Sequence, residues 1–299
     1  MWRLGLGGGI LWACLIALAA CAPPATPTRV PTATPPPTLP PATETPTPAP
    51  TATATRLPTV APTPTAFVTA PAPGSAAVVP ILMYHNLVDL PGNATQLQLD
   101  WTVAPKNFDA QMSWLAQHGF HAISFAQLVA HFKQGQPLPA KPIIISFDDG
   151  WAEQYSVAFP ILKKYGLRGT FFIYTNPVEH SKYVTWAQLQ EMTNAGMEIG
   201  SHAQSHPHLR AVSAAEALKE LSESKAVLEK RLGKPVVVFN YPFGEFNSAV
   251  TELVKRAGYE CAVTLAGGYR QRADELFTLH RIRVAYPDTL DAFVKRLPP

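Results

Sequence analysis

Apolar and polar positions alternate regularly in this chain from about residue 78 to the C-terminus. Seven short apolar runs are typical of buried parallel strands, and they lie at residues 79–83, 143–147, 170–174, 197–201, 236–241, 259–265 and 281–284. Helical patterns fill most of the intervals. The clearest, at residues 213–232, has Ser213 as N-cap, Glu216 as its capping-box partner and Gly233 at its end. Strands that alternate with helices predict an α/β fold in which helices cover a parallel sheet.

The first 77 residues lack this alternation and divide into two segments. Residues 1–21 begin with Arg3 and continue through an apolar stretch that is short for a spanning helix, which is typical of a secretory signal. The small residues before Cys21 resemble a bacterial lipobox, which implies cleavage there and a lipid on the cysteine sulfur. An ordinary signal peptide or an uncleaved anchor is the alternative. Residues 22–77 hold more than half of the 31 prolines, and we expect a disordered Thr/Pro-rich linker that cannot bury enough apolar surface to fold.

The remaining residues, 78–299, are enough for one domain with a full core. A net charge of +3 and the lack of a basic run interleaved with aromatic residues give no indication of nucleic-acid binding. Besides Cys14 in the signal and Cys21, the chain contains only Cys261. We therefore expect no disulfide within the mature chain, and Cys261 is expected to be an inert core residue.

Two short motifs carry the candidate chemistry. In the first, Asp148 and Asp149 directly follow the strand at 143–147, so a pair of carboxylates lies where a buried strand emerges. In the second, His202 and His206 are spaced at i and i+4, which on a helical turn directs both imidazoles to one side. One carboxylate and two histidines form a facial set of ligands for a divalent metal ion, and the second carboxylate can act as a base toward a metal-bound water. The sequence predicts a metal-dependent hydrolase.

Each motif alone has a simpler structural explanation. The two carboxylates followed by Gly150 are also common in a turn that caps a helix, and two histidines can be partners in a polar surface turn. Their joint presence at the ends of predicted strands favours a site, because catalytic groups gather at that end of a (β/α) barrel. A closed or distorted (β/α) barrel is therefore favoured over an open doubly wound sheet. Since no glycine-rich loop follows any strand, we expect no nucleotide site.

Five stretches of the chain can be compared with a known family. They are PILMYH at 80–85, SFDDG at 146–150, GTFF at 169–172, EIGSH at 198–202 followed by His206, and YPFG at 241–244. In this order they resemble the polysaccharide deacetylase family, the NodB-homology domain of carbohydrate esterase family 4. The similarity is greatest to the branch that deacetylates poly-N-acetylglucosamine and other exopolysaccharides.

The resemblance implies roles for the residues of both motifs. In a distorted (β/α) barrel of the polysaccharide deacetylase type, Asp149, His202 and His206 would bind one divalent ion, and Asp148 would be the general base. Zinc is the expected ion, with cobalt, nickel or manganese as alternatives.

The resemblance also implies an oxyanion site and substrate contacts. The loop at 241–244 would present the backbone N–H of Phe243 to the oxyanion and wall the substrate groove. Tyr241, Trp186 and Trp151 are candidates for stacking on sugar rings, although packing in the core is the simpler explanation for any single aromatic residue.

Two positions depart from the family pattern. The arginine that usually orients the base is replaced by Asn240, and Arg281 or Arg283 is a candidate substitute. The usual histidine acid lies two residues after a leucine, but here His280 follows its leucine directly, which would turn the imidazole to the other strand face. We therefore favour His85, at the end of the first strand, as the general acid.

These features predict an enzyme that hydrolyses the N-acetyl groups of an N-acetylglucosamine polymer, such as peptidoglycan, poly-N-acetylglucosamine or a chitin-like glycan, and releases acetate. An O-acetyl xylan esterase with the same centre and a catalytically inactive wall-binding lipoprotein are the alternatives. A glycoside hydrolase would instead need two carboxylates across a cleft. We expect a monomer outside the cytoplasm that binds polysaccharide and is anchored to the membrane through Cys21, or exported.

Overall fold

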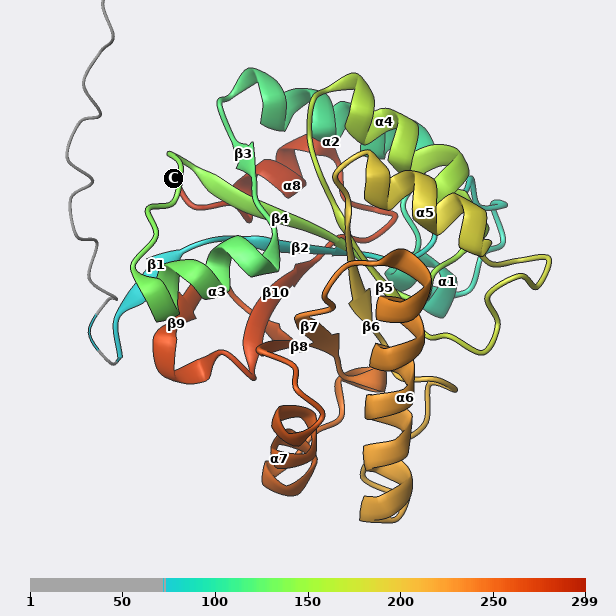
Figure 1. Ribbon diagram of the computed structural model, residues 1–299. Coiled ribbons are helices and arrows are strands. Elements are labelled where there is room, and N and C mark those ends of the chain that lie inside the picture. The colour runs from blue at the N-terminus through green and yellow to red at the C-terminus, as the bar shows by residue number, and fades with distance from the viewer. Residues whose placement is uncertain (1–71, 73) are drawn as a thin grey trace, which may run out of the picture. The chain divides into compact units, whose positions relative to one another are not determined.

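Seven parallel strands close into a barrel in the computed structural model, which describes residue 72 and residues 74–299 (Figure 1). In spatial order the strands are β2 (Ile81–Tyr84), β10 (Leu279–Arg283), β8 (Cys261–Gly267), β7 (Val238–Asn240), β6 (Glu198–Ser201), β5 (Thr170–Ile173) and β4 (Pro142–Phe147). The ring closes because β2 pairs with β4 as well as with β10. The predicted distorted (β/α) barrel is confirmed, and each of the seven predicted runs overlaps one of its strands.

Three short strands outside the ring were not predicted. β3 (His121–Ala122) pairs with the start of β4. β1 (Ala76–Val78) pairs antiparallel with β9 (Arg270–Arg272), so the paired chain begins two residues before the expected domain start at residue 78. The predicted signal segment, Cys21 and nearly all of the predicted linker lie outside the described residues.

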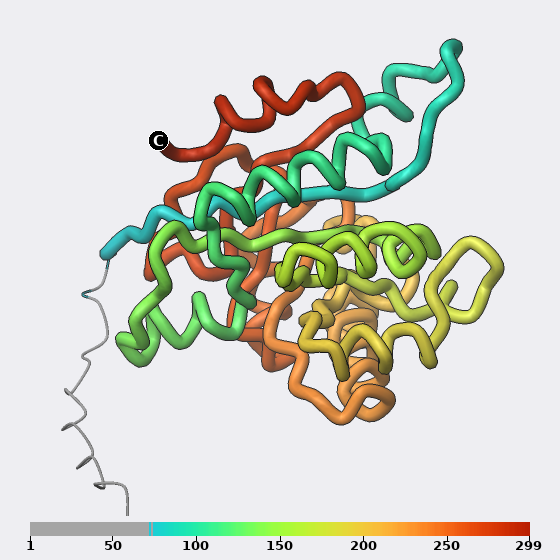
Figure 2. Tube along the Cα trace, turned by 90° about the horizontal axis from the view of Figure 1, so that it is seen from above, coloured from blue at the N-terminus to red at the C-terminus, as the bar shows by residue number. Residues whose placement is uncertain are grey.

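Helices lie around the barrel, most of them on its outer face (Figures 1 and 2). They are α1 (Gln96–Trp101), α2 (Pro105–Gln117), α3 (Phe125–Gln134), α4 (Phe159–Lys164), α5 (Trp186–Asn194), α6 (Ala214–Leu232), α7 (Ser248–Arg256) and α8 (Leu290–Lys295). A π-helical turn, η1 (Gln154–Ala158), precedes α4, and short 3₁₀ turns η2 (Pro242–Gly244) and η3 (Ala273–Glu275) follow later. In the described part of the chain, no helix combines the length and the apolar character needed to span a membrane.

The longest helix, α6, has the predicted ends. The hydroxyl of Ser213 accepts a hydrogen bond from the N–H of Glu216 at 3.2 Å, which is one of the two bonds of the predicted capping box. At the other end Gly233 has a φ of 64°, a left-handed conformation that glycine adopts without a steric penalty.

The interior of the barrel is filled by alternate strand residues and by the apolar face of α3. This buried cluster comprises Val79, Ile81, Ile123, Phe125, Leu128, Val129, Phe132, Ile144, Phe172, Val238, Cys261, Val263, Leu276 and Leu279. Cys261 is therefore a free, buried core residue, as expected. The other strand residues face a second cluster between the barrel and its outer helices.

Candidate metal centre and active site

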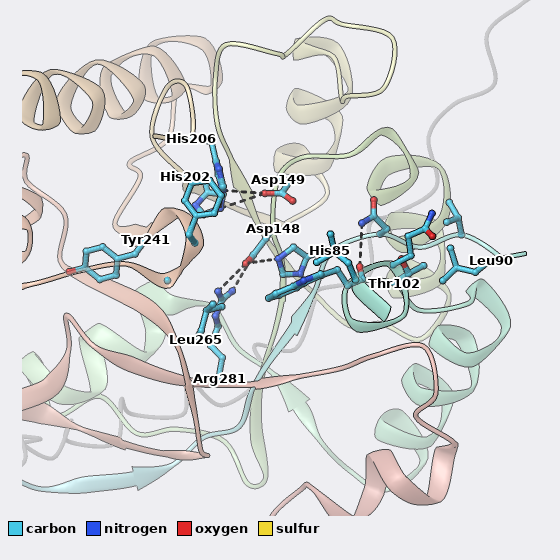
Figure 3. Close-up of a pocket in the computed structure, with 17 residues that line it drawn as sticks. His85, Leu90, Thr102, Asp148, Asp149, His202, His206, Tyr241, Leu265 and Arg281 are labelled. Atoms are coloured by element: carbon cyan, nitrogen blue, oxygen red, sulfur yellow. Dashed lines mark hydrogen bonds and ion pairs between the residues drawn. The ribbon is translucent and has the colours of Figure 1, made fainter. Parts of the chain in front are cut away.

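Strand alternation brings the candidate residues together at the carboxyl end of the barrel (Figure 3). Ile144 belongs to the inner cluster, so Asp148, four residues later, faces the same side. Leu279 also belongs to that cluster, so Arg281 faces inward and His280 turns outward. The site is therefore assembled from strands that are distant in sequence but whose carboxyl ends meet at one end of the ring.

The three predicted metal ligands form one cluster. The Nε2 atoms of His202 and His206 are 3.1 Å apart, and Asp149 Oδ1 lies 3.6 and 3.7 Å from them. The Nδ1 atom of His202 lies 2.7 Å from the carbonyl oxygen of Asn240, which leaves Nε2 free for a ligand bond. The indole N–H of Trp151 donates to the other carboxylate oxygen of Asp149 at 3.1 Å. Ligands bonded at about 2.1 Å to one ion lie roughly 3–3.5 Å apart, so this donor set fits a divalent cation.

The protonation of these three groups reflects their burial. Burial lowers the pKa of His202 to about 3 and also lowers the pKa of His206, so both imidazoles are neutral at neutral pH with a lone pair available. Burial, together with the charge of Asp148, raises the pKa of Asp149 to about 7. A cation at this position would compensate the negative charge that burial disfavours.

Glu220 of α6, which the sequence did not indicate, holds the loop that carries His206. Its carboxylate accepts hydrogen bonds from the backbone N–H groups of Gln204 and Ser205 at 2.8 and 2.9 Å, and from the Ser205 hydroxyl at 2.7 Å. The loop needs this support because Ala203 and His206 have φ values of 67° and 59°, which are unfavourable for residues with a side chain. The pattern of α6 gave no signal for Glu220, since a glutamate is an ordinary residue on the polar side of a helix.

Of the two arginines that could replace the missing orienting arginine, Arg281 is the one that pairs with Asp148. Its Nη1 and Nη2 atoms donate to Oδ1 and Oδ2 of Asp148 at 2.7 and 2.9 Å, and Nη2 also donates to Asn240 Oδ1 at 3.1 Å. This guanidinium holds the pKa of the buried Asp148 carboxyl well below its usual range, against the effect of burial. Arg283 instead lies with its guanidinium 4.9 Å from the centre of the Trp101 ring. Asn240 stands where the family usually has the arginine, and it accepts a hydrogen bond from Arg281, which takes that arginine's place.

His85, and not His280, reaches the site. Its Nε2 atom lies 3.5 Å from Asp148 Oδ2, and its ring packs on Trp101 with 4.4 Å between centroids. Burial lowers the pKa of His85 to about 4, and the nearby Asp148 charge acts in the opposite direction. His280 lies beside Gly268, away from the cleft, so the alternation that turns it outward excludes it from this group.

A cleft of about 590 Å³ lies over these groups. Its rim is largely apolar and includes Val88, Leu90, Leu97, Trp101, Phe243 and Leu265. Phe243 has a φ of 58° and its ring stacks on His208 at 4.0 Å between centroids. Gly244 next to it has a φ of 68°, and a Cβ there would lie 2.4 Å from the Leu265 side chain, so only glycine fits this turn.

The comparisons with known proteins agree with this geometry. A family model described as polysaccharide deacetylase matches residues 135–262, which include β4 to β7 and the carboxylate and histidine motifs. YxkH of Bacillus subtilis, which is named as a polysaccharide deacetylase, is 30% identical over 209 residues, covering 70% of this chain and 72% of YxkH. The chain belongs to the polysaccharide deacetylase family.

Solved structures of similar proteins share the fold of this polysaccharide deacetylase. The Streptococcus pyogenes deacetylase PplD, solved in complex with acetate, superposes with a TM-score of 0.70 at 28% identity, covering 75% of this chain and all of PplD (100%). A polysaccharide deacetylase from Bacillus anthracis superposes with a TM-score of 0.67 at 30% identity, covering 75% of this chain and 70% of that one. The poly-β-1,6-N-acetyl-D-glucosamine N-deacetylase of Escherichia coli is 24% identical over 259 residues, which are 72% of this chain and only 38% of the longer relative.

The three aromatic residues that were candidates for stacking on sugar rings lie in three different surroundings. Trp186 does not line the cleft; it lies at the start of α5, with the Arg231 guanidinium 5.3 Å from its ring centre. Tyr241 borders the cleft, but its side chain is buried and its hydroxyl donates to the Phe277 carbonyl at 3.2 Å, so the ring is part of the core. Trp151 stacks on a tyrosine and binds Asp149, which gives it a role beside the metal cluster.

Proposed function

We propose that this polysaccharide deacetylase removes N-acetyl groups from an extracellular or cell-wall polymer of N-acetylglucosamine and releases acetate. It is a hydrolase that acts on carbon–nitrogen bonds other than peptide bonds. Relatives from E. coli and Staphylococcus aureus that are named poly-β-1,6-N-acetyl-D-glucosamine N-deacetylases support the substrate class. The observation that carries the proposal is the buried Asp148–Arg281 pair beside the cluster of Asp149, His202 and His206 on the floor of one cleft.

Asp149, His202 and His206 would hold one divalent cation, and zinc is the ion we expect. One carboxylate and two neutral imidazoles are a donor set that zinc accepts while leaving positions open. A bound cation would supply Lewis acidity, which polarises the acetamide carbonyl and lowers the pKa of water.

Asp148 would be the general base. The ion pair with Arg281 keeps its carboxylate ionised and fixes its orientation, so it can accept a proton from the attacking water. The backbone N–H of Phe243 would donate to the oxygen on which negative charge develops.

His85 would be the general acid, because an amine leaves efficiently only when it is protonated. As the carbon–nitrogen bond breaks, the imidazolium proton passes to the amine nitrogen, and the acetyl group departs as acetate with the oxygen of the water. Burial keeps the pKa of His85 at about 4 even with the Asp148 carboxylate 3.5 Å away, so the imidazole is neutral in the free enzyme. The proton that Asp148 takes from the water would therefore pass to His85 across this contact before it goes to the amine.

We also propose that the enzyme acts outside the cytoplasm, anchored through a lipid on Cys21, with residues 22–77 as the linker. The lipobox-like residues before Cys21 and the Thr/Pro-rich composition support this location.

The test has two measurements on the purified protein. One is its metal content, and the other is the acetate it releases from poly-N-acetylglucosamine, chitin oligosaccharides, peptidoglycan and acetylated xylan. His202→Ala should lose both the metal and acetate release. The matched variant His121→Ala should keep both, because His121 is exposed in β3 and lines neither the cluster nor the cleft. Stoichiometric metal in His202→Ala would overturn the metal assignment. Acetate from xylan alone would favour the esterase, and glycan binding without acetate from any substrate would favour an inactive wall-binding protein.

A further inference from the structure

The proposed acid and base leave two neighbouring strands at the same level. β2 and β4 pair in parallel with Tyr84 opposite Phe147, and the N–H of Asp148 continues the ladder by donating to the Tyr84 carbonyl at 2.9 Å. The next residue after Tyr84 is His85. The carbonyl groups of His85 and Asp148 are therefore the first ones beyond the ladder, and whatever binds them sets the spacing of the two side chains.

One side chain binds both carbonyls. Gln154 is fully buried (0% exposed), and its Nε2 atom donates to the carbonyl oxygens of His85 at 3.1 Å and Asp148 at 2.5 Å. An amide nitrogen has two hydrogens, and each is used for one carbonyl. The assignment of the amide nitrogen follows from these partners, because the amide oxygen could not donate to either.

A distortion of the helix accompanies this contact. Gln154 is the first residue of the π-helical turn η1, whose bond runs from the Phe159 N–H to the Gln154 carbonyl. The following residue, Pro160, has no N–H to continue a regular ladder, which accounts for a widened turn here. Such turns occur often at functional sites. In the described residues Gln154 Oε1 is buried without a hydrogen-bond partner, which costs free energy of folding.

We propose that Gln154 is a positioning residue that fixes the separation of the general base Asp148 and the general acid His85. This inference rests on the proposed function. The two reacting side chains are 3.5 Å apart, and proton removal from water and proton delivery to the amine must both reach one acetamide group. A single amide that joins the two strand ends coordinates these positions without touching the substrate.

A matched glutamine at the opposite end of the barrel provides the control. Gln271 is also buried, and its Nε2 atom donates to the carbonyls of Val79 and His280 at 3.0 Å each, at the amino ends of β2 and β10. Gln271→Leu therefore removes a similar pair of hydrogen bonds across two neighbouring strands, and with it a third that Gln271 Oε1 accepts from the His280 N–H at 3.0 Å. Its effect measures the loss of stability alone.

The experiment compares Gln154→Leu, Gln154→Asn and Gln271→Leu on an N-acetylglucosamine oligomer and on 4-nitrophenyl acetate, with metal content and Tm measured for each. The amide needs a protonated leaving group, whereas nitrophenolate leaves without an acid. We expect Gln154→Leu to lower kcat on the amide about 10- to 100-fold at unchanged metal content and KM, with a much smaller loss on the ester. Gln154→Asn is too short to reach both carbonyls and should lie between wild type and Gln154→Leu.

Equal losses on amide and ester, or equal losses in kcat for Gln154→Leu and Gln271→Leu, would overturn the positioning role. If Gln154→Leu does not fold, Gln154→Asn is compared with the wild type in the same way. A ratio of amide to ester turnover equal to that of the wild type would then overturn the positioning role. An active wild type with a silent Gln154→Leu variant contradicts this inference alone. A wild type that releases no acetate from any N-acetylated glycan contradicts the proposed function instead.

Discussion

Asp148 and Arg281 are both removed from water, so each charge depends on the other. Arg281→Met would leave the Asp148 carboxylate buried without its partner, and breaking such a pair costs about 3–5 kcal/mol of unfolding free energy. The double variant Asp148→Asn/Arg281→Met removes the stranded charge and should regain part of that stability. Denaturant unfolding of the three proteins measures both effects.

The control is Arg272→Met, since Arg272 forms an exposed pair with Asp274 on the protein surface. That variant should unfold like the wild type, because exposed pairs are largely screened by water. A double variant no more stable than Arg281→Met would show that the buried charge is not the cause of the loss.

The assignment of the general acid is tested separately. His85→Ala should lower kcat on the amide substrate by about 10²- to 10⁴-fold, because the amine then leaves without a proton donor. Metal content should be unchanged, since His85 is not one of the three clustered ligands. His280→Ala, on the outward face of β10, should have a much smaller effect. A large loss for His280→Ala with a silent His85→Ala would reverse the assignment.

At the residue level, the sequence was most informative where strand alternation controls the side chain. Asp148, Asp149 and His202 immediately follow strands and come together as predicted from their positions. Trp186 could not be located in this way, because its surroundings depend on how α5 packs beside Arg231 of α6. Burial of the Tyr241 ring likewise depends on a carbonyl that lies 36 residues later.

At the level of elements, β10 explains why the sequence left two arginines open. Arg281 and Arg283 are two residues apart, so alternation directs both to the same face. They differ in their position along the strand: Arg281 lies buried within β10, and Arg283 lies exposed at its end. Their positions relative to the ring depend on a register shift between Leu279 and Arg281 in the pairing with β8. No local sequence pattern encodes such a shift. The two- and three-residue strands β1, β3 and β9 were missed because they are too short to show a period.

The short helix α1 has no buried residue, so core packing does not explain it. A complete capping box between Thr95 and Gln98 stabilises it, and its Leu97, 68% exposed, lines the cleft. We expect Leu97→Ser to raise KM for a polymeric substrate roughly fivefold, because about 1 kcal/mol of apolar contact with a sugar ring is lost.

Turnover of 4-nitrophenyl acetate by Leu97→Ser should stay close to wild type, since the small ester does not reach the rim. Leu290→Ser, at an exposed position of α8 outside the cleft, is the control and should leave both substrates unaffected. An unchanged KM for the polymer in Leu97→Ser would mean that α1 does not contact the glycan.

For the whole molecule, the proposed location of the enzyme rests on Cys21. Cys21→Ala should release the protein from membrane fractions or block its processing, because the lipid would have no sulfur to occupy. Fractionation followed by immunoblotting measures this, and Cys261→Ala is the control since Cys261 is buried in the core. Wild-type protein found in the cytoplasm with an intact N-terminus would contradict the proposed anchor.

Closure of the barrel joins the first and last strands of the ring, β2 and β10, and Arg281 lies 133 positions after Asp148. Synthesis proceeds from the N-terminus, so a growing chain contains both carboxylates and both histidines well before it contains the guanidinium that pairs with Asp148. Until then the ring lacks strand β10, and the Asp148 carboxylate has no counter-charge. A growing chain that has not yet reached Arg281 should therefore lack a working general base, because the guanidinium that holds Asp148 is still missing.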